Sequence, residues 1–396
     1  MTAATPAWID ELNSYDPGPS DPYHGASLAW NPRTASTSLV LTQEYDTLKL
    51  LERLVKDVKF IVNAREEMHF VKSSSSKDGP DWISPKIERG LVSIFKTDQT
   101  ELESIHPGHT FNPFIEALRT TMWTHPKLAH LADWHSTLSH DEQAEFRAEA
   151  IKFCFALRAA CKTPEFGRTL SKFVRRCRKN QYGSERYIDS LFRNKGCRHL
   201  ILRLEMSYSA DKLRGGAVNT VTEGQARSDF AKWLRWVRQS FPMTGYIWKL
   251  EYGTHRGYHF HVIVFMNGHL EQSEHLRIMD LGEHWMEQIT EGQGLYFNCN
   301  AQTYLRDGTG MIDHSDSRKI AYLKNDVVNY LTKTDFWIAA NGGKWFGKGH
   351  MPEDRNPLAK YPGRPRTRLG SDDKQVEIGL PDRGAYFHEP VTDGAP

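Results

Sequence analysis

Two histidines stand at the start of an apolar run in the stretch Tyr-Gly-Thr-His-Arg-Gly-Tyr-His-Phe-His-Val-Ile-Val-Phe, residues 252–265. The β-branched and aromatic residues from 258 onward predict a buried strand. Residues 246–252 have a similar composition and end just before a short glycine-containing turn, so the two runs predict a hairpin. The histidines, His259 and His261, are either core residues with satisfied hydrogen bonds or a pair that faces a ligand together.

The order of elements around this hairpin indicates the fold class. Residues 199–208 alternate between apolar and polar side chains as a strand does, and Thr222 with Gln225 predicts a capping box for a helix over 223–241. Further elements are expected as a helix over 273–289, a strand over 294–299 and a helix from about 316 to 334. This order predicts an α+β domain with a central antiparallel sheet and helices packed on one face.

Composition divides the chain into four segments. Residues 1–40 are rich in Pro, Ser, Thr, Asn and Gly and are expected to be irregular. Residues 41–195 have helical periodicity, so we expect a mainly helical region, of unknown role and basic at its end. Residues 196–352 contain the α+β order, and residues 353–396 form a Pro- and Gly-rich basic tail that is expected to order only when bound.

Positive charge is concentrated in one part of the chain. The net charge is only +2, but residues 172–198 contain nine Lys or Arg and two acidic residues. Such a cluster fits a polyanionic partner, because Lys and Arg displace condensed counterions from phosphates. A solvated helix face is the other interpretation, and charge alone does not decide between them.

Cysteine usage and hydropathy indicate the compartment. The five cysteines are odd in number and lack CxxC spacing, which argues against a disulfide framework and against a zinc ribbon. The N-terminus has no signal-peptide pattern, and no apolar run approaches the roughly 18 residues that cross a membrane. We therefore expect a cytosolic chain.

His259 and His261 are expected to share one face of their strand, because alternate side chains point the same way. Two imidazoles about 7 Å apart can share a divalent metal, since each neutral ring offers one nitrogen lone pair. A hard cation also needs oxygen ligands, and Glu251 on the partner strand is the expected supplier. A three-residue turn with Gly257 left-handed would pair Glu251 with His261, whereas a two- or four-residue turn would send Glu251 to the Phe260 face.

A second candidate feature is Tyr330-Leu-Thr-Lys333 at the end of the last expected helix. Tyr330 and Lys333 are three residues apart, so they occupy neighbouring positions on one helical face. A tyrosine hydroxyl with a pKa near ~10 attacks phosphorus poorly until the phosphate is polarised, and a nearby ammonium stabilises transition-state charge. The ordinary alternative is a helix terminus in which Tyr330 is half-buried and Lys333 complements the dipole.

Taken in order, these motifs resemble the HUH endonucleases, which initiate rolling-circle replication. A two-histidine strand preceded by a hairpin glutamate and followed by a helix with Tyr-x-x-Lys is the pattern of that superfamily. The resemblance is closer to the inovirus-type replication proteins, including the YagK/YfjJ-type domain of bacterial prophages. It covers about residues 196–352, through EYGTHRGYHFHV at 251–262, GLYFNCN at 294–300, GMID at 310–313, YLTK at 330–333 and WFGKGH at 345–350.

The resemblance implies a rolling-circle replication initiator of a phage or prophage element, with a domain of the HUH type over 196–352. His259, His261 and Glu251 would hold Mg²⁺ or Mn²⁺ against the scissile phosphate of single-stranded DNA. Tyr330 would attack that phosphate, leaving a 5′-phosphotyrosyl link and a free 3′-hydroxyl, and Lys333 would position or neutralise the phosphate.

Two further residues have secondary roles in this interpretation. Glu205 on the first strand would be an extra ligand or a group that orients a ligand. Tyr322 lies about 80° round an ideal helix from Tyr330, so a two-tyrosine mechanism is open but less favoured than a single nucleophile.

The resemblance also gives the basic segments a partner. The candidate DNA contacts are Arg175, Arg176, Arg178, Lys179, Lys344 and Lys348. Trp345 and Phe346 either stack on bases or pack in the core. The implied partner is single-stranded DNA at a replication origin, with host helicase and polymerase as further candidates, in the cytoplasm of a bacterial host and without a membrane.

Two alternatives to a replication initiator remain. A related tyrosine-dependent transposase or relaxase would use the same site on another element. A non-catalytic DNA-binding prophage remnant would keep the fold without the activity, but the intact ligand and tyrosine motifs argue against it, since decay should remove a ligand early.

Overall fold

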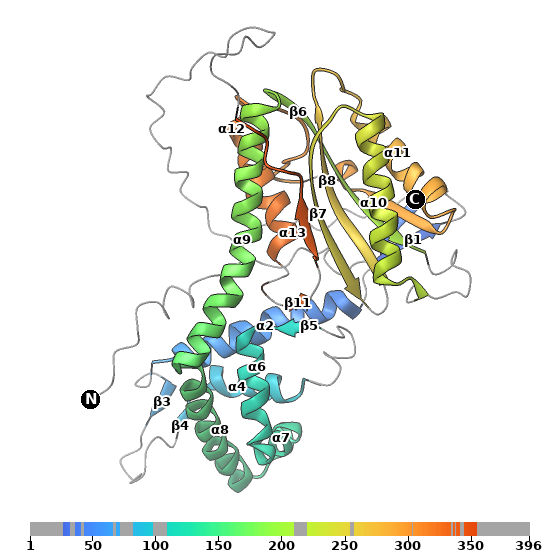
Figure 1. Cartoon of the computed structure of the whole chain (residues 1–396). Helices are drawn as coiled ribbons and strands as arrows, with labels where there is room; N and C mark the ends of the chain where they lie inside the picture. Colours follow the sequence, from blue (N-terminus) through green and yellow to red (C-terminus); the bar gives the residue numbers. More distant parts are fainter. Residues whose placement is uncertain are drawn as a thin grey trace, which may run out of the picture.

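The computed structural model describes residues 27–31, 36–40, 43–65, 69–71, 82–97, 109–209, 220–253, 257–302, 304–333, 336, 338–340 and 344–354. Within these ranges the chain combines helices with a six-stranded antiparallel sheet, so the α+β class is confirmed. Figure 1 shows the sheet and its helices above, a helical unit below, and the long helix α9 (Pro164–Asn194) running between them. No helix in these ranges is long and apolar enough to cross a membrane.

The central sheet has the strand order β10-β6-β8-β7-β12, and β9 also pairs with β6. Its strands are β6 (Arg198–Tyr208), β7 (Met243–Gly253), β8 (Gly257–Asn267), β9 (Gly294–Asn298), β10 (Gly310–Asp313) and β12 (Phe346–Lys348). The histidine strand β8 lies in the interior, between β6 and β7. Its position is therefore fixed by backbone hydrogen bonds on both edges.

The β7–β8 hairpin has the predicted face but a different register. Gly257 has a φ of 66°, the left-handed conformation expected of it, and it pairs with Gly253 across three residues. Glu251 lies opposite His259, so the predicted pair with His261 is wrong. The ladder runs unbroken from Gly253 and Gly257, so no bulge shifts the register there. Glu251 still reaches the histidine face, because His259 and His261 share that face.

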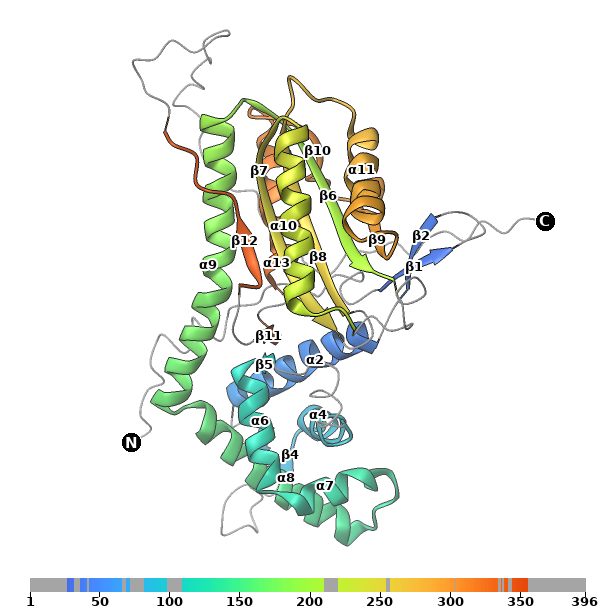
Figure 2. The ribbon, with the colours of Figure 1, turned by 45° about the vertical axis from the view of Figure 1, so that its right-hand side comes forward.

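Helices cover both faces of the sheet, so the expectation of helices on one face is wrong. α10 (Glu223–Ser240), α11 (Glu274–Glu283) and the π-helical η3 (His284–Ile289) pack on one face, and α9 with the α12–α13 rod packs on the other. Figure 2 shows α10 in front of the sheet and α13 behind it. Neighbouring residues such as Val262 and Ile263 are both buried, on opposite faces, and each apolar face needs a cover.

Local sequence signals place two of these helices. Thr222 caps α10 by accepting a hydrogen bond from the Gln225 backbone N–H at 3.1 Å, which is one half of the predicted capping box. The Gln225 side chain donates forward to Asp229 at 2.9 Å instead of returning to Thr222, so the other half of the predicted box is wrong. The last predicted helix is a rod of three parts, α12 (Ser317–Tyr322), the π-helical η5 (Leu323–Val328) and α13 (Asn329–Lys333). Its close packing requires Gly308, where a Cβ would lie 2.4 Å from the backbone nitrogen of Leu323.

The helical unit confirms that the region before the sheet is mainly helical, and it adds short strand pairs. Its helices are α2 (Gln43–Asn63), α4 (Pro85–Phe95), α6 (Pro113–Trp123), α7 (Pro126–Asp133), the 3-10 turn η1 (His135–Thr137) and α8 (His140–Cys161). The pairs are β3 (Phe70–Val71) with β4 (Trp82–Ile83) and β5 (His109–Phe111) with β11 (Ile338–Ala340).

Residues 1–40 are not irregular throughout. β1 (Ser27–Asn31) and β2 (Ser36–Val40) form an antiparallel pair, so that expectation is wrong for these residues. The β-forming Trp30, Leu39 and Val40 lie among the turn-forming residues of this segment, and backbone pairing between the two short runs outweighs its overall composition.

α9 (Pro164–Asn194) belongs to both parts of the molecule. Leu170 and Val174 in its first half are buried in the core of the helical unit, whereas Ile188 and Leu191 in its second half are buried against the sheet. The chain crosses back after α13, where Phe336 is buried in the core of the helical unit. A boundary at residue 195 therefore does not separate two independent cores.

Removing a buried side chain from the second half of α9 should destabilise the sheet core. Ile188 is 0% exposed, so Ile188→Ala is expected to lower the free energy of unfolding by about 2–5 kcal/mol. Tyr182 on the same helix is 62% exposed, and Tyr182→Ala should change it by less than about 0.5 kcal/mol. Urea denaturation of both variants checks this, and equal effects would contradict the bridging role of α9.

Candidate active site

One face of the sheet changes from apolar to charged along the strands. Ile201, Ile247 and Phe265 pack under α9 and the α12–α13 rod. Nearer the β7–β8 turn the same face carries Arg203 and Glu205 from β6, Lys249 and Glu251 from β7, and His259 and His261 from β8. Three strands therefore bring six ionisable side chains to one surface, and Figures 1 and 2 both place this end of the sheet next to α2.

Glu251 lies between the two histidines. Its Oε2 is 3.3 Å from Nε2 of His259 and 3.2 Å from Nε2 of His261. Nδ1 of His259 lies 3.1 Å from the carbonyl oxygen of Gly257, a contact that Nδ1–H makes by donating. A neutral His259 then directs the Nε2 lone pair at a carboxylate oxygen, and two acceptors at this distance need a proton or a cation between them. Metal-bound histidines have this arrangement, with the second nitrogen donating to a carbonyl.

Glu205 joins the cluster from the other side. Its Oε2 is 3.4 Å from Nδ1 of His261, and its side chain is almost fully buried. Glu205, His259 and His261 each offer a ligand atom, and these atoms all lie within 4.8 Å of one another. Two imidazoles and the Glu205 carboxylate form a donor set that fits a divalent cation, and Glu251 approaches the other nitrogen of His261. The structure thus brings together all four residues that the sequence singles out for a metal.

Two charged residues of this face were not singled out from the sequence. Lys249 is 4% exposed and its Nζ lies 2.9 Å from Oε1 of Glu251, so a buried positive charge balances the carboxylate. Arg203 is 6% exposed, and its guanidinium carbon lies 4.0 Å from the centre of the Tyr330 ring. In the sequence, each of the two is a charged residue on the polar side of an alternating strand. Only the pairing of strands shows which side chains they contact.

Tyr330 packs directly on the histidine cluster. Its ring centre is 5.4 Å from that of His261, with an interplanar angle of 74°. The side chain is 3% exposed, so it is more deeply buried than the half-buried helix terminus considered from the sequence. Lys333 is the last residue of α13, and its side chain lies outside the described residues. The predicted tyrosine and the predicted ligands therefore meet, although they are about 70 residues apart in the chain.

Tyr322 has a different environment. The guanidinium carbon of Arg306 lies 5.0 Å from the centre of its ring. The π-helical η5 lies between Tyr322 and Tyr330, so the 80° rotation expected for an ideal helix does not apply. Of the two tyrosines, Tyr330 is the one that contacts a histidine of the cluster.

The predicted DNA contacts lie on two surfaces. Arg175, Arg176, Arg178 and Lys179 are exposed on the first half of α9. Lys348 lies beside the second half, where burial, then the charges of Arg186 and Lys344, lower its pKa. The structure thus gathers positive charge where β12 meets α9. The basic residues after 354 lie outside the described residues.

Trp345 and Phe346 are both partly buried against the sheet cores. The Trp345 ring lies 6.2 Å from that of Tyr258 and 6.1 Å from that of His109. Core packing thus accounts for much of the surface that the two side chains bury.

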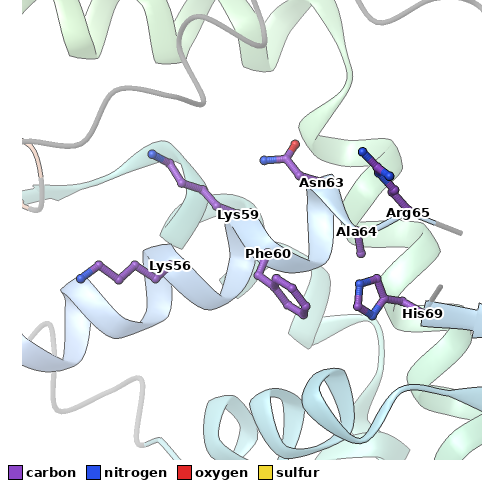
Figure 3. Close-up of a pocket in the computed structure, with 7 residues that line it drawn as sticks. All are labelled: Lys56, Lys59, Phe60, Asn63, Ala64, Arg65 and His69. Carbon is purple, nitrogen blue, oxygen red and sulfur yellow. The ribbon is translucent and has the colours of Figure 1, made fainter. Parts of the chain in front are cut away.

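A hollow of about 440 Å³ lies apart from this site, on the helical unit. Figure 3 shows its lining, with Phe60, Ala64 and His69 beside cationic side chains from α2 and the residues after it. The cations are Lys56, Lys59 and Arg65. None of the predicted catalytic or ligand residues lines this hollow.

If the two carboxylates act as ligands, each should contribute to metal affinity. Glu205→Gln and Glu251→Gln are each expected to weaken Mn²⁺ binding at least about tenfold, because each removes an anionic oxygen beside the histidines. His275 is exposed on α11, and His275→Ala should leave the affinity unchanged. Isothermal titration calorimetry checks this, and unchanged binding in both glutamine variants would contradict the proposed donor set.

Comparison of the chain with protein-family models, with curated proteins and with solved structures found no match. What the site residues have in common is a buried face on which His259, His261, Glu205 and Glu251 meet an aromatic hydroxyl-bearing side chain, Tyr330.

Proposed function

We propose that this chain is a metal-dependent endonuclease that nicks and joins single-stranded DNA through Tyr330 and starts rolling-circle replication of a phage or prophage element. The observation that carries the proposal is the contact of Tyr330 with His261, at 5.4 Å between ring centres, on a face where Glu205 and Glu251 also contact His261. A tyrosine that only filled the core would not need a cluster of ionisable groups beneath its ring.

Four side chains would act as ligands, and two further groups hold them in position. His259, His261, Glu205 and Glu251 would hold the cation, Mg²⁺ or Mn²⁺, which when bound would polarise an oxygen of the scissile phosphate. Lys249 holds Glu251 through its Oε1 and leaves Oε2 directed at both histidines. The Gly257 carbonyl orients His259. These supports keep the ligands in place before DNA arrives.

Tyr330 would supply the nucleophile. Its oxygen forms a bond to phosphorus and the bond from phosphorus to the 3′-oxygen breaks, so one ester is exchanged for another and no water is consumed. The phenol loses a proton, and the departing 3′-oxygen gains one. Arg203, whose guanidinium carbon lies 4.0 Å from the centre of the Tyr330 ring, would favour the phenolate form of that ring. Since Tyr330 is 3% exposed, an incoming strand has to displace part of its packing.

The DNA strand would follow the cationic side chains at the junction of β12 and α9. Burial lowers the pKa of Lys348, and the nearby charges of Arg186 and Lys344 lower it further. Such mutual repulsion in the free protein is relieved when a phosphate lies between the cations. The sugar–phosphate backbone of the DNA would then continue past the exposed cations of the first half of α9.

The direct test is incubation with single-stranded DNA and Mn²⁺, followed by a denaturing gel that detects protein-linked DNA. Wild type is expected to form the adduct, and Tyr330→Phe should reduce it at least about a thousandfold, because the attacking oxygen is gone. Tyr322→Phe is the matched control and should retain it. An adduct that persists in Tyr330→Phe and disappears in Tyr322→Phe would overturn the assignment.

Neutralising one cation of the proposed DNA path should change the salt dependence of DNA binding by a defined amount. Lys344 is exposed, and Lys344→Gln should lower the slope of log affinity against log salt by about 0.7 for single-stranded DNA, in a similar way for every sequence. Lys96→Gln, an exposed cation after α4, should leave the slope unchanged. Fluorescence anisotropy measures both, and equal slopes for Lys344→Gln and wild type would exclude this contact.

A further inference from the structure

A second group of metal-ligating side chains lies at the opposite end of the sheet, where β6 begins and where β8 and β10 end. Cys197 directly precedes β6, His314 directly follows β10, and His269 follows β8 by two residues. Because β6 lies between β10 and β8 in the sheet, Cys197 has a histidine on each side. These residues are 72 and 117 positions apart from Cys197 in sequence, so only the fold assembles them.

The backbone holds the three segments together. The His314 N–H donates to the Cys197 carbonyl oxygen at 2.6 Å, and the Gly268 N–H donates to that of Arg198 at 3.0 Å. Gly268 permits this approach, since a Cβ there would lie 2.7 Å from the sulfur of Met311. The turn that carries His269 is thus fixed close to the start of β6.

Two sets of side-chain contacts share the Cys197 thiol. Sγ of Cys197 is 3.3 Å from Nε2 of His269. Cys197, Asp313 and His314 offer ligand atoms that all lie within 4.8 Å of one another. Zinc–sulfur and zinc–nitrogen bonds of about 2.3 and 2.0 Å at a tetrahedral angle put the two ligand atoms roughly 3.5 Å apart. The Cys197–His269 pair is already near that spacing.

Hydrogen bonds orient Asp313 and His314. Oδ1 of Asp313 accepts from the Ser315 backbone N–H at 3.0 Å and from its hydroxyl at 2.8 Å. Nδ1 of His314 lies 2.9 Å from the same oxygen, so that nitrogen donates and Nε2 keeps the lone pair. A carboxylate that fixes the tautomer of a histidine is a usual partner of a histidine ligand.

We infer that Cys197, His269 and His314, with Asp313 orienting His314, form a second metal site, selective for Zn²⁺ or a similar borderline transition ion. A thiolate with two imidazoles favours such ions over Mg²⁺ or Mn²⁺, which prefer oxygen. Cys197, Asp313 and His314 are partly exposed, so an ion can enter from solvent. A bound ion would clamp the start of β6 to the ends of its two neighbours. The absence of CxxC spacing excludes a zinc ribbon but not a site built from three strands.

Cobalt substitution tests the site without any assay of activity, on the full chain. Wild type should bind Co²⁺ with a near-ultraviolet thiolate-to-cobalt band that saturates on titration. Cys197→Ser should abolish the band, and His269→Ala and His314→Ala should each weaken binding at least about tenfold. His275→Ala is the control that should keep it. The double variant His259→Ala/His261→Ala should also keep it, which separates this site from the one proposed for catalysis.

Thiol labelling gives a second measurement on the unaltered protein. All five cysteines are described, and Cys197 is partly exposed whereas the other four are buried. A maleimide should therefore label Cys197 first, and Zn²⁺ should slow that labelling at least about tenfold. A missing thiolate band in wild type, a band that survives in Cys197→Ser, or a labelling rate unaffected by Zn²⁺ would each overturn the inference.

Discussion

The contact of one carboxylate, Glu251, with two histidines is the interaction on which the candidate site depends. His259 and His261 are 3% and 2% exposed, so neither ring can rely on water for its hydrogen bonds. One carboxylate oxygen of Glu251 contacts both rings, and the other contacts the ammonium of Lys249. Burial makes these electrostatic contacts strong, and it would make any missing partner costly. The rest of the sheet supplies that burial.

The two-faced sheet explains how a buried charged cluster and an apolar core can occur in one fold. α10 and α11 close one face with apolar side chains, which holds β6, β7 and β8 rigid. α9 and the α12–α13 rod cover only part of the other face with apolar contacts and place Tyr330 at the border with the charged residues. The first half of α9 is packed in the helical unit and its second half on the sheet, so one helix positions the two parts.

Much of the site could be predicted from alternation and turn chemistry. A period of two puts His259 and His261 on one face, and Gly257 has the left-handed conformation that the sequence predicts for it. Pairing between strands distant in sequence could not be predicted, because a period of two does not specify which residue lies opposite. That is why Glu205 was only a weak candidate and Lys249 and Arg203 were missed. The second apolar face was missed for a related reason, since a continuous apolar run does not show which side each residue covers.

Peptide mapping of the DNA-linked protein tests the central claim most directly. Trypsin cleavage after Lys324 and Lys333 places Tyr330 in the peptide 325–333, whereas cleavage after Lys319 and Lys324 places Tyr322 in the peptide 320–324. After reaction with single-stranded DNA and Mn²⁺ and nuclease trimming, mass spectrometry should find a nucleotide remnant on Tyr330 in the first peptide. A remnant on any other residue, or cleaved DNA with no protein-linked nucleotide, would contradict Tyr330 as the nucleophile.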